Sequence, residues 1–553
     1  MNSENINKPR TIRQMLISSA EKYPENNAFL IKKEEEIFPV TYKSFKADVD
    51  ALAAAFLKVL GLRGKKIAIS GKNSYEWCLT YMAVMSGVGI LVPIDKELTG
   101  QEIANILNMS KADAIICDNE VAEKILKNIH SIDNRPVMIS CEEREKDSLI
   151  PLHVLLQKGY ELLSQGFCLP EEGQIMPQSL AVLLFTSGTT GVAKGVMLSN
   201  DNLCSDLAAV TDSVEITSED RSLSVLPLHH TYESIAFLMV ICKGGCICFC
   251  RSFRYLLRDF GEYQPTVFVS VPLILEKIHS RIISVMEKEG KLRKVRLFSV
   301  VAPTIRYEKR KEIFSDIHTL FGGRLKKIIV GAAALQKNVA EDFELFGIPI
   351  IIGYGLTECS PIVICNSDTE RTPDSIGKPI KTVQVKIVDS DEQGIGEIHV
   401  KGPMVMLGYY NNRDETEKVM RDGWFNTGDL GYRDKNGNYH ITGRSKNVIV
   451  TNTGKNIYPE ELEFYLSKSP FVKECLVYSI ETDIITAEVL PDEEEVKQKA
   501  KKDDPTEKEI YAIINDVVKS VNRKLPSYKR IRRLVIRNNE FDKTTTHKIK
   551  RKQ

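Results

Sequence analysis

Short, almost continuously apolar runs alternate with helix-like stretches between residues 65 and 360, and this alternation constrains the fold more than any other feature of the sequence. Strands that are apolar on both faces belong in parallel sheets that helices cover on both sides. The pattern therefore predicts an α/β protein built from layered subdomains. Six of the runs are LAVLLFT (180–186), LSVLP (223–227), CICFC (246–250), VFVSVP (267–272), KKIIVGA (326–332) and PIIIGYG (349–355).

The order of the predicted elements divides the chain into two domains. After about residue 382 the apolar runs give way to short strands with turn signals, which predict a β-rich subdomain. The stretch that begins at residue 443 predicts a hairpin, a helix starting at Pro459 and further strands, and a unit of about 110 residues can fold alone. We therefore expect a large N-terminal domain, 1–443, and a small, mobile α+β C-terminal domain, 444–553.

Composition excludes some partners and suggests a compartment. The chain has 553 residues, too many for one simple core, and its 75 Lys and Arg balance 74 Asp and Glu. This balance gives no signature of a nucleic-acid partner. The N-terminal MNSENINKPR lacks the apolar core of a signal peptide, and twelve cysteines without regular pairing intervals suit a reducing compartment. We expect a cytoplasmic protein.

The longest apolar stretch, 235–250, fits neither a membrane span nor a metal site. Lys243-Gly244-Gly245 interrupts it, which predicts a buried helix, a turn and a strand. Cys246, Cys248 and Cys250 alternate at a spacing of two, so they line one face of a strand and do not surround an ion.

A glycine- and hydroxyl-rich loop lies in LFTSGTTGVAKGVML (184–198), directly after the first of the six runs. Its glycines let the backbone curl around an anion, consecutive N–H groups then point inward, and Lys194 adds a positive charge. A Walker A loop does not fit, because Ala193 stands in place of its second glycine and Gly195 follows Lys194. The simpler alternative is a flexible surface turn. The residues expected to bind phosphate are Thr186, Ser187, Gly188, Thr189, Thr190, Gly191 and Lys194.

Six further motifs follow in order: LPLHH (226–230), VGAAAL (330–335), YGLTE (354–358), FNTGDL (425–430), GRSKN (443–447) and TTTHKIKR (544–551). In this order and at these separations they resemble the adenylate-forming, AMP-binding superfamily of acyl-CoA synthetases, aryl-CoA ligases and luciferases. The resemblance begins at residue 41 and covers nearly the whole chain. It implies that a carboxylate attacks the α-phosphorus of ATP, giving an acyl-adenylate and pyrophosphate. The acyl group then passes to the thiol of CoA, and AMP is released.

The resemblance also implies roles around the phosphates. The loop would hold the β- and γ-phosphates of ATP. Glu358, in YGLTE, resembles the family's magnesium-binding glutamate, and a hard cation that bridges phosphates needs such an oxygen ligand. Thr357 and the hydroxyl of Thr189 are expected beside the α-phosphate and the metal. His230 aligns with the histidine that the family places at the acyl carboxylate, and His229 is expected to be structural or solvent-facing.

Other residues match the family's nucleoside site. Asp429, in NTGDL, is expected to accept hydrogen bonds from the ribose hydroxyls, and Arg444 adds a ribose or phosphate contact. Gly331 and Ala332 would let the backbone approach the adenine ring, although Gly331 also fits a simple tight strand exit. Tyr354, followed by Gly355, would cover the other side of the ring.

The expected catalytic lysine is Lys548. The family pattern P-K-T-x-x-G-K stands here as DKTTTHK (542–548), with Asp542 in place of Pro and His547 in place of Gly. The positive charge would act when the two anions meet during adenylation. The alternative is a solvated basic tail formed by Lys548, Lys550, Arg551 and Lys552.

A lysine that closes the site during adenylation blocks the path of the thiol. The family resolves this by rotating its C-terminal domain about a hinge. Lys446 occupies the hinge position, and Gly454 stands where the family's backbone lines the pantetheine tunnel of CoA.

Two features favour a medium- to long-chain fatty acid as the acid. HHTYE (229–233) and the segment 255–335 resemble the long-chain acyl-CoA synthetase branch. Because no membrane span is predicted, membrane contact would be peripheral. The basic runs 529–533 and 548–552 are candidates for contact with CoA phosphates or anionic lipid.

Two alternatives stay open. The acceptor thiol is either that of CoA or that of an acyl-carrier-protein phosphopantetheine arm, because the thiol chemistry is identical. A protein of another class would hold a nucleotide or acyl-adenylate without catalysis, and the departures at Asp542 and His547 are the features in its favour. The predicted ligands are ATP, Mg²⁺, CoA and the acid, and the sequence does not predict an oligomeric state.

Overall fold

The chain divides into two compact units: unit 1 comprises residues 1–385 and 400–425, and unit 2 comprises residues 386–399 and 426–553. The computed structural model describes residues 9–142, 149–186, 193–451, 456–479, 484–543, 549 and 551. The domain boundary after residue 443 stays a prediction.

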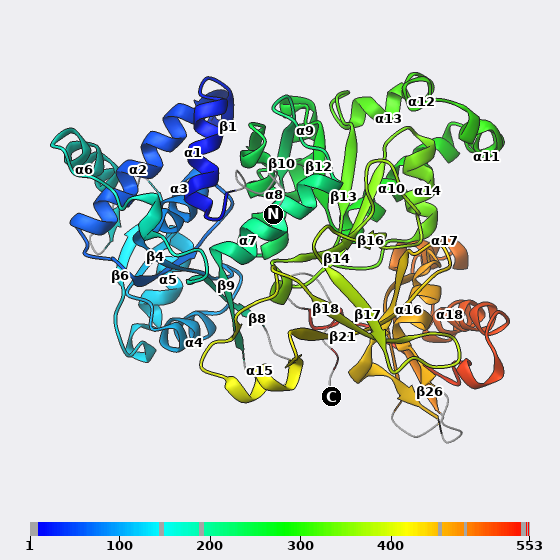
Figure 1. Ribbon diagram of the computed structural model, residues 1–553. Helices are drawn as coiled ribbons and strands as arrows, with labels where there is room; N and C mark the ends of the chain where they lie inside the picture. Colours follow the sequence, from blue (N-terminus) through cyan, green and yellow to red (C-terminus); the bar gives the residue numbers. More distant parts are fainter. Residues whose placement is uncertain are drawn as a thin grey trace. The chain divides into compact units, whose positions relative to one another are not determined.

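Nine strands of unit 1 form one sheet: β1 (Asn27–Lys33), β2 (Glu36–Thr41), β10 (Arg221–Ser224), β11 (Cys246–Phe249), β12 (Val267–Ser270), β13 (Lys327–Val330), β14 (Ile350–Gly355), β15 (Ile362–Cys365) and β16 (Lys378–Pro379). Their order is β16-β15-β14-β13-β12-β10-β11-β1-β2 (Figure 1). The strands from β14 to β1 are parallel, so their carboxyl ends meet along one edge of the sheet, the carboxyl edge. Their amino ends meet along the opposite, amino edge.

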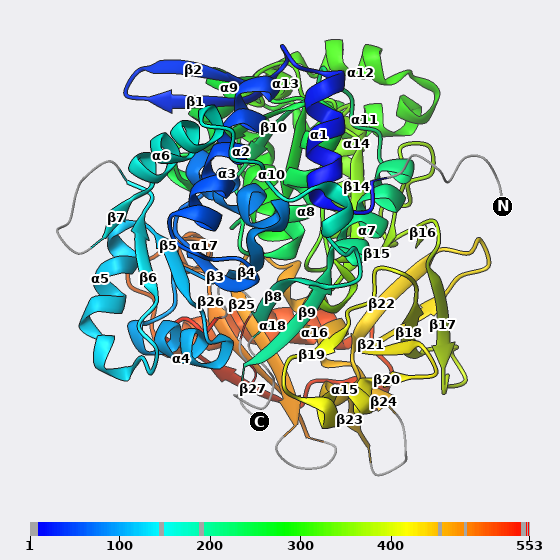
Figure 2. The same cartoon turned by 60° about the vertical axis from the view of Figure 1, so that its left-hand side comes forward.

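A second sheet of unit 1 has eight strands: β3 (Lys65–Ser70), β4 (Gly89–Pro93), β5 (Ala114–Cys117), β6 (Val137–Ser140), β7 (Ile150–Pro151), β8 (Leu180–Thr186), β9 (Lys194–Ser199) and β19 (Gly408–Tyr409). Their order is β19-β9-β8-β4-β3-β5-β6-β7. Figure 2 shows β3, β5 and β6 side by side, with α4 (Gly100–Ser110) and α5 (Asn119–Lys127) beside them. Apolar side chains of both helices pack on this sheet, among them Ile103, Leu107, Val121 and Ile125.

Thirteen more helices belong to unit 1 in its described residues: α1 (Ile12–Lys22), α2 (Tyr42–Lys58), α3 (Tyr75–Ala83), α6 (Leu152–Ser164), α7 (Asn200–Ser213), α8 (Thr231–Cys242), α9 (Leu256–Tyr263), α10 (Pro272–Lys288), α11 (Leu292–Val301), α12 (Tyr307–Ile313), α13 (Ser315–Leu320), α14 (Lys337–Leu345) and α15 (Arg413–Val419). Several begin at a hydroxyl residue that accepts a hydrogen bond from a backbone N–H of the first turn, as Thr41 does for α2 and Ser74 for α3. Ser199 and Asn202 form a reciprocal cap that starts α7 immediately after β9.

The apolar stretch 235–250 forms the end of α8, a turn and strand β11, which confirms the predicted helix, turn and strand. Cys246 and Cys248 are buried in β11. Among the residues that the structure describes, no helix has the length and apolarity required to span a membrane.

Unit 2 contains most of a five-stranded sheet and a small mixed core. The sheet has the order β17-β18-β21-β20, with β22 paired to β21. Its strands are β17 (Gln384–Val388), β18 (Gly396–Lys401), β20 (Met420–Arg421), β21 (Trp424–Arg433) and β22 (Tyr439–Arg444). The remaining elements are β23 (Ile449–Val450), β24 (Asn456–Ile457), α16 (Pro459–Ser467), β25 (Val472–Ser479), β26 (Ile485–Pro491), α17 (Glu493–Ala500), α18 (Glu507–Asn522) and β27 (Arg533–Ile536). Leu462, Val477, Val489 and Ile514 lie in its core. The predicted fold class is confirmed.

Candidate active site

The predicted phosphate loop connects the two strands of a hairpin. β8 and β9 pair antiparallel, and Thr186 lies opposite Lys194 at their ends. The hydroxyl of Thr186 donates a hydrogen bond to the carbonyl oxygen of Lys194 at 3.5 Å. Antiparallel pairing within the hairpin thus fixes Thr186 and Lys194 at the two ends of the loop. Its predicted phosphate ligands Ser187, Gly188, Thr189, Thr190 and Gly191 lie outside the described residues.

Lys194 has two partners that the sequence analysis did not identify. Its ammonium group forms an ion pair with Glu415 of α15 at 2.5 Å and lies 5.1 Å from the ring centroid of Tyr409 in β19. The hydrogen bond from Lys194, assisted by one from Lys418, lowers the pKa of Glu415 to about 2. Glu415 is therefore a carboxylate at neutral pH and compensates the charge of Lys194.

Glu358 reaches the same tyrosine. It lies in the short helix η7 (Thr357–Cys359), which begins with Thr357 just beyond β14. The hydroxyl of Tyr409 donates to Oε1 of Glu358 at 3.0 Å, and the backbone N–H of Met406 donates to the Glu358 carbonyl oxygen at 2.8 Å. Burial, together with the charge of Glu358, raises the pKa of Tyr409, so its hydroxyl stays a donor. Tyr409 thus links the predicted phosphate-binding lysine to the predicted metal-binding carboxylate.

The predicted acyl-side residue His230 lies beyond the carboxyl end of β10, at the N-cap of α8. Its ring centroid is 4.2 Å from that of His229. His229 is largely buried, with Nε2 3.5 Å from a carboxylate oxygen of Asp95, so the structural role is the correct one of its two predicted alternatives. The Nε2 atom of His230 is also buried.

Asn73 holds the loop that leads to His230, a role that sequence reasoning missed. Its side-chain amide donates to the carbonyl oxygen of Leu226 at 2.6 Å and to the hydroxyl of Ser224 at 3.0 Å, and it accepts from the N–H of Leu228 at 3.1 Å. Ser224 in turn donates to Oε1 of Glu233 at 2.5 Å. The loop is therefore anchored by side-chain hydrogen bonds.

Glu233 is a buried carboxyl group on α8, within the HHTYE motif. Burial raises its pKa to about 8, although the hydrogen bond from Ser224 opposes this shift. Its Oε2 atom has no hydrogen-bond partner among the described residues. In the first turn of α8, just after His230, the fold therefore favours the neutral form of this carboxyl group at pH 7.

The glycines at the other carboxyl ends are explained by close contacts. A Cβ on Gly331 would lie 3.1 Å from the ring of Tyr232, whose hydroxyl donates to the carbonyl oxygen of Ile329 at 3.2 Å. A Cβ on Gly355 would lie 1.9 Å from the carbonyl oxygen of Pro361, so only glycine fits. Ala332 has a left-handed backbone with φ 69°, and Tyr354 pairs with Ile364 across β14 and β15.

In unit 2, Asp429 and Arg444 lie opposite each other on β21 and β22. The Arg444 Nε atom is 2.8 Å from Asp429 Oδ1, and a second guanidinium nitrogen donates to the carbonyl oxygen of Thr427 at 3.2 Å. The two predicted ribose ligands thus form one pair. Lys446 follows in the short helix η8 (Ser445–Asn447), whereas Gly454 lies outside the described residues.

The described residues on either side of Lys548 have defined partners. Lys548 itself lies outside the described residues, but Lys543 and Ile549 form an antiparallel bridge. Arg551 donates to both carboxylate oxygens of Glu463, at 2.6 and 2.7 Å, and to the carbonyl oxygen of Val477 at 2.8 Å. Burial raises the pKa of Glu463 to about 7, with Arg551 opposing the shift. The alternative of a solvated basic tail is therefore wrong for Arg551, because its guanidinium group is paired with the carboxylate of Glu463.

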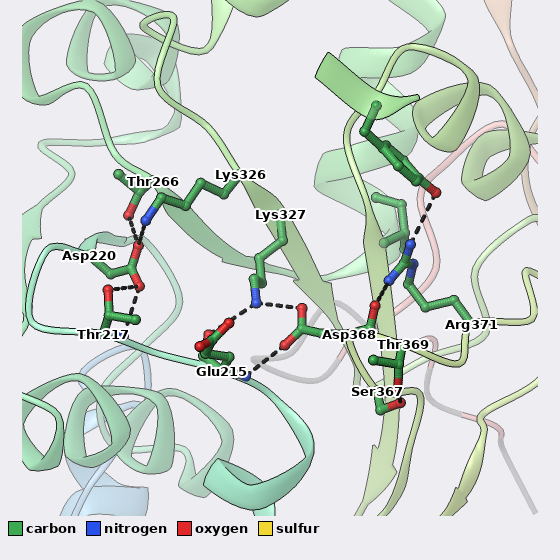
Figure 3. Close-up of polar contacts among 12 residues, drawn as sticks. Glu215, Thr217, Asp220, Thr266, Lys326, Lys327, Ser367, Asp368, Thr369 and Arg371 are labelled. Carbon is green, nitrogen blue, oxygen red and sulfur yellow. Dashed lines mark hydrogen bonds and ion pairs between the residues drawn. The ribbon is translucent and has the colours of Figure 1, made fainter. Parts of the chain in front are cut away.

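The amino edge of the nine-stranded sheet carries a different set of charges (Figure 3). Asp220 accepts from Lys326 at 2.7 Å, from Thr266 at 2.7 Å and twice from Thr217. Burial raises the pKa of Asp220, but these hydrogen bonds outweigh it and the net shift is downward. Lys327 pairs with Asp368, which also accepts from the N–H of Glu215 at 2.7 Å. We call Asp220, Lys326, Lys327 and Asp368 the amino-edge network.

Comparison with known proteins identifies the family. The family model of AMP-binding enzymes matches residues 16–410, and that of the AMP-binding enzyme C-terminal domain matches residues 446–553. The chain therefore belongs to the AMP-binding enzyme family, as its motifs predict.

Individual relatives and a solved structure agree with this assignment. The chain is 28% identical to the chloroplastic long-chain-fatty-acid–(acyl-carrier-protein) ligase AEE15 of Arabidopsis thaliana, covering 87% of this chain and 76% of that protein. It is 30% identical to the long-chain-fatty-acid–CoA ligase ACSBG1 of Rattus norvegicus, covering 82% and 67%. The crystal structure of the anthranilate CoA ligase AuaEII in complex with anthranoyl-AMP superposes with a TM-score of 0.78 at 19% identity, covering 100% of this chain and 97% of that one. This similarity establishes the fold.

Proposed function

We propose that the protein activates a medium- to long-chain fatty acid with ATP, forming an acyl-adenylate and then an acyl thioester of CoA. The observation that carries the proposal is the convergence of Lys194 and Glu358 on Tyr409, beside the base of the phosphate loop. A cation and a carboxylate at one tyrosine are suited to a polyphosphate and its counter-cation. The fatty-acid ligase relatives support the choice of acid.

In adenylation, a carboxylate oxygen of the acid forms a bond to the α-phosphorus of ATP, and pyrophosphate leaves with the electron pair of the broken P–O bond. Lys194 and the loop residues 186–191 would neutralise the phosphates, and His230 would orient the acyl carboxylate. Thr357 would lie near the α-phosphate. Positive charge and fixed donors lower the barrier because both reactants are anions.

The carboxyl group of Glu358 fits a Mg²⁺ ligand. Its Oε1 atom is oriented by the hydroxyl of Tyr409, and carboxylate oxygens are the ligands that Mg²⁺ prefers. The described residues contain no group of three or more His, Cys, Asp or Glu that could hold a metal ion without a ligand. A single carboxylate therefore suits a cation that arrives with the phosphates, and the Thr189 hydroxyl is a second proposed ligand. The cation would supply charge neutralisation at the phosphate oxygens.

Adenosine binding is proposed for the carboxyl-end residues of unit 1, Gly331, Ala332, Tyr354 and Gly355, and for Asp429 and Arg444 in unit 2. Asp429 is 6% exposed and already accepts a charged hydrogen bond from Arg444, so it is an oriented carboxylate for ribose hydroxyls. Lys446 is the proposed hinge and Gly454 the proposed CoA contact of a mobile domain, 444–553. The C-terminal family match, which begins at residue 446, supports this boundary.

Lys548 is the proposed catalytic lysine of adenylation. Described residues on both sides of Lys548 make specific contacts: Lys543 bridges Ile549, and Arg551 forms a bidentate pair with Glu463. Lys548→Ala should therefore abolish acid-dependent pyrophosphate exchange yet leave thioester formation from supplied acyl-adenylate largely intact. Equal damage to both half-reactions would contradict this role and the domain rotation.

The experiment that tests the function is ATP–pyrophosphate exchange with acids of increasing chain length. Each buried methylene contributes about 0.8 kcal/mol, close to a fourfold gain in apparent affinity, until the acyl site is full. A flat series from short to long acids, or a preference for aromatic acids, would refute the fatty-acid assignment. No exchange with any acid would favour the non-catalytic binding protein.

The acceptor thiol needs a separate comparison. The AEE15 relative acts on an acyl carrier protein by its name, and this observation favours the phosphopantetheine arm of such a protein as the second candidate acceptor. Thioester formation measured with CoA and with holo acyl carrier protein distinguishes the two.

For the compartment we propose the cytoplasm, because all twelve cysteines are free thiols, as a reducing environment maintains them.

A further inference from the structure

Helix α11, which contains none of the candidate active-site residues, exposes an apolar strip. In both ribbon views α11 and α12 lie at the periphery of the green part of unit 1 (Figures 1 and 2). On α11, Leu297 is 74% exposed, Val300 is 79% exposed and Val301 is 49% exposed. Spacings of three and four residues place these side chains on one side of the helix. We call the three residues the α11 face.

The rest of α11 is fixed in the protein. Val295 is buried in the core beside the nine-stranded sheet, and Leu292 and Phe298 pack against the same core. The α11 face is therefore held outward by a packed helix rather than carried on a free segment. Three exposed aliphatic side chains on ten residues indicate an interaction surface.

Basic residues outnumber acidic ones around the α11 face, and Glu289 and Glu308 flank the basic stretch. Residues 290–307 contain five Lys and Arg and no Asp or Glu. Arg296 and Arg306 are exposed, and no ion pair of either guanidinium occurs within the described part of the chain. Lys291, in contrast, pairs with Glu289 at 2.7 Å and with Asp316 at 3.5 Å, so it contributes little net charge. A helix that is apolar on one face and basic beside it is typical of a membrane-surface segment.

We propose that the α11 face docks the protein on an anionic lipid surface. Leu297, Val300 and Val301 would enter the boundary between headgroups and acyl chains, and Arg296 and Arg306 would contact lipid phosphates. The proposal is independent of the proposed enzymatic function. It also differs from the basic runs 529–533 and 548–552 of the sequence analysis. In those runs Lys529 is buried against Glu461 at 2.7 Å, and Arg551 is bound to Glu463.

Two other occupants fit less well. A second copy of the chain docked on the same face would bring two sets of basic residues together, and like charges oppose such a symmetric contact. An acidic protein that encloses a basic helix in a groove needs access to most of the helix surface. α11 has only ten residues, and its inner side lies in the core. A flat anionic surface contacts the exposed side alone.

The test is flotation of the full chain with vesicles of phosphatidylcholine alone and with 30% phosphatidylglycerol, about one in three lipids. The wild-type protein should float with the anionic vesicles and far less with the neutral ones. Leu297→Ser with Val300→Ser should weaken binding to anionic vesicles by about tenfold. Arg296→Gln should weaken it by about fivefold. The matched control is Met176→Ser with Val59→Ser, which removes two exposed apolar side chains elsewhere in unit 1 and should bind like the wild type.

Octanoate-dependent pyrophosphate exchange without vesicles checks that each variant is folded and active, and it separates this proposal from the proposed function. Failure of the wild type to bind anionic vesicles overturns the lipid proposal, as does equal binding by the Leu297→Ser, Val300→Ser variant. Binding to an acidic protein such as a calmodulin, with no binding to vesicles, also overturns it. A dimer that the same double substitution dissociates would assign the face to a second copy instead.

Discussion

The two edges of the nine-stranded sheet hold buried or half-buried carboxyl groups in different ways. At the amino edge, each oxygen of Asp220 and Asp368 accepts from an ammonium, a hydroxyl or a backbone N–H (Figure 3). On the carboxyl side, Glu233 has one oxygen bonded to Ser224 and the other without a hydrogen-bond partner among the described residues. Asp220 and Glu233 are buried and Asp368 is half-buried, but only the two amino-edge carboxylates have a partner for each oxygen.

This contrast separates stability from function. A buried carboxylate whose oxygens all have partners lowers the free energy of unfolding little. Removing one partner lowers it strongly, because a buried charge is then uncompensated. An incompletely satisfied group lowers stability and is retained where it serves a site. The amino-edge network is therefore expected to affect folding without affecting catalysis, and the residues beyond the carboxyl edge are expected to affect catalysis.

The largest expected effect is on Glu358. Glu358→Gln removes the charge that would bind Mg²⁺ but keeps an acceptor for Tyr409, so the fold should be preserved. Acid-dependent pyrophosphate exchange should fall by about 10²- to 10³-fold, with the midpoint of thermal unfolding nearly unchanged. Exchange assays over a range of Mg²⁺ concentrations, paired with calorimetry, measure both quantities. A variant that loses stability but keeps its rate would place Glu358 with the structural carboxylates.

The second prediction addresses the amino-edge network. Asp368→Ala leaves Lys327, which is largely buried, without its counter-charge. The free energy of unfolding should fall by about 3 kcal/mol, while kcat per folded molecule stays the same. Urea unfolding followed by active-site-normalised exchange gives both values. Replacing the pair together, Lys327→Met with Asp368→Leu, should restore most of the loss, and a large loss of kcat in either variant would break the proposed contrast.

The sequence predicted the strands and the residues that follow them better than the contacts between residues far apart in the chain. The positions of Thr186, His230, Gly331 and Glu358 after apolar runs are visible because strands and their exits are local patterns. Tyr409 and Glu415 were missed because their partner Lys194 is more than two hundred residues away and reaches them only through the pairing of β19 with β9. Sequence contains no local signal for that pairing.

A second kind of miss concerns burial. Glu233 belongs to the HHTYE motif and Asn73 to no motif considered above, and neither was expected to have a role, because both residue types are usually exposed. Only the packed structure shows that Asn73 forms hydrogen bonds with Ser224, Leu226 and Leu228, before His230. Only the packed structure shows that Glu233 is buried. The signal available in sequence was a polar residue inside an apolar helix, and α8 has Glu233 as its single charged residue.

The third prediction concerns the pH dependence of stability. Because the pKa of Glu233 is raised to about 8 from an ordinary 4.5, the native state retains a proton that the unfolded state has released. Proton binding by Glu233 therefore favours the native state. This contribution to the free energy of unfolding is complete below pH 4.5 and is lost as the pH rises towards 8. Glu233→Gln keeps a neutral acceptor for Ser224, so between pH 5 and 8 its stability should fall less than that of the wild type, by on the order of 2 kcal/mol. Denaturation midpoints at several pH values measure this. Parallel curves would show that Glu233 is ionised in the native state, and the exposed Glu219→Gln is the control.

The smallest expected effect tests the ion pair of Lys194 with Glu415. Glu415 pairs with Lys194 as the amino-edge carboxylates pair with their lysines, and its side chain is 26% exposed against 4% for Asp220. Lys194 is also the proposed phosphate ligand. If this pair is exchangeable, Glu415 competes with ATP for Lys194. Glu415→Gln should then lower the KM for ATP by about threefold, as expected for loss of a partly exposed pair, and leave the unfolding midpoint within error. Glu417→Gln on the same helix, whose carboxylate pairs with exposed Arg413, should change neither value.

A raised KM would mean that Glu415 holds Lys194 in its working position rather than competing for it. Pairing on the catalytic side would then serve the same structural purpose as pairing at the amino edge.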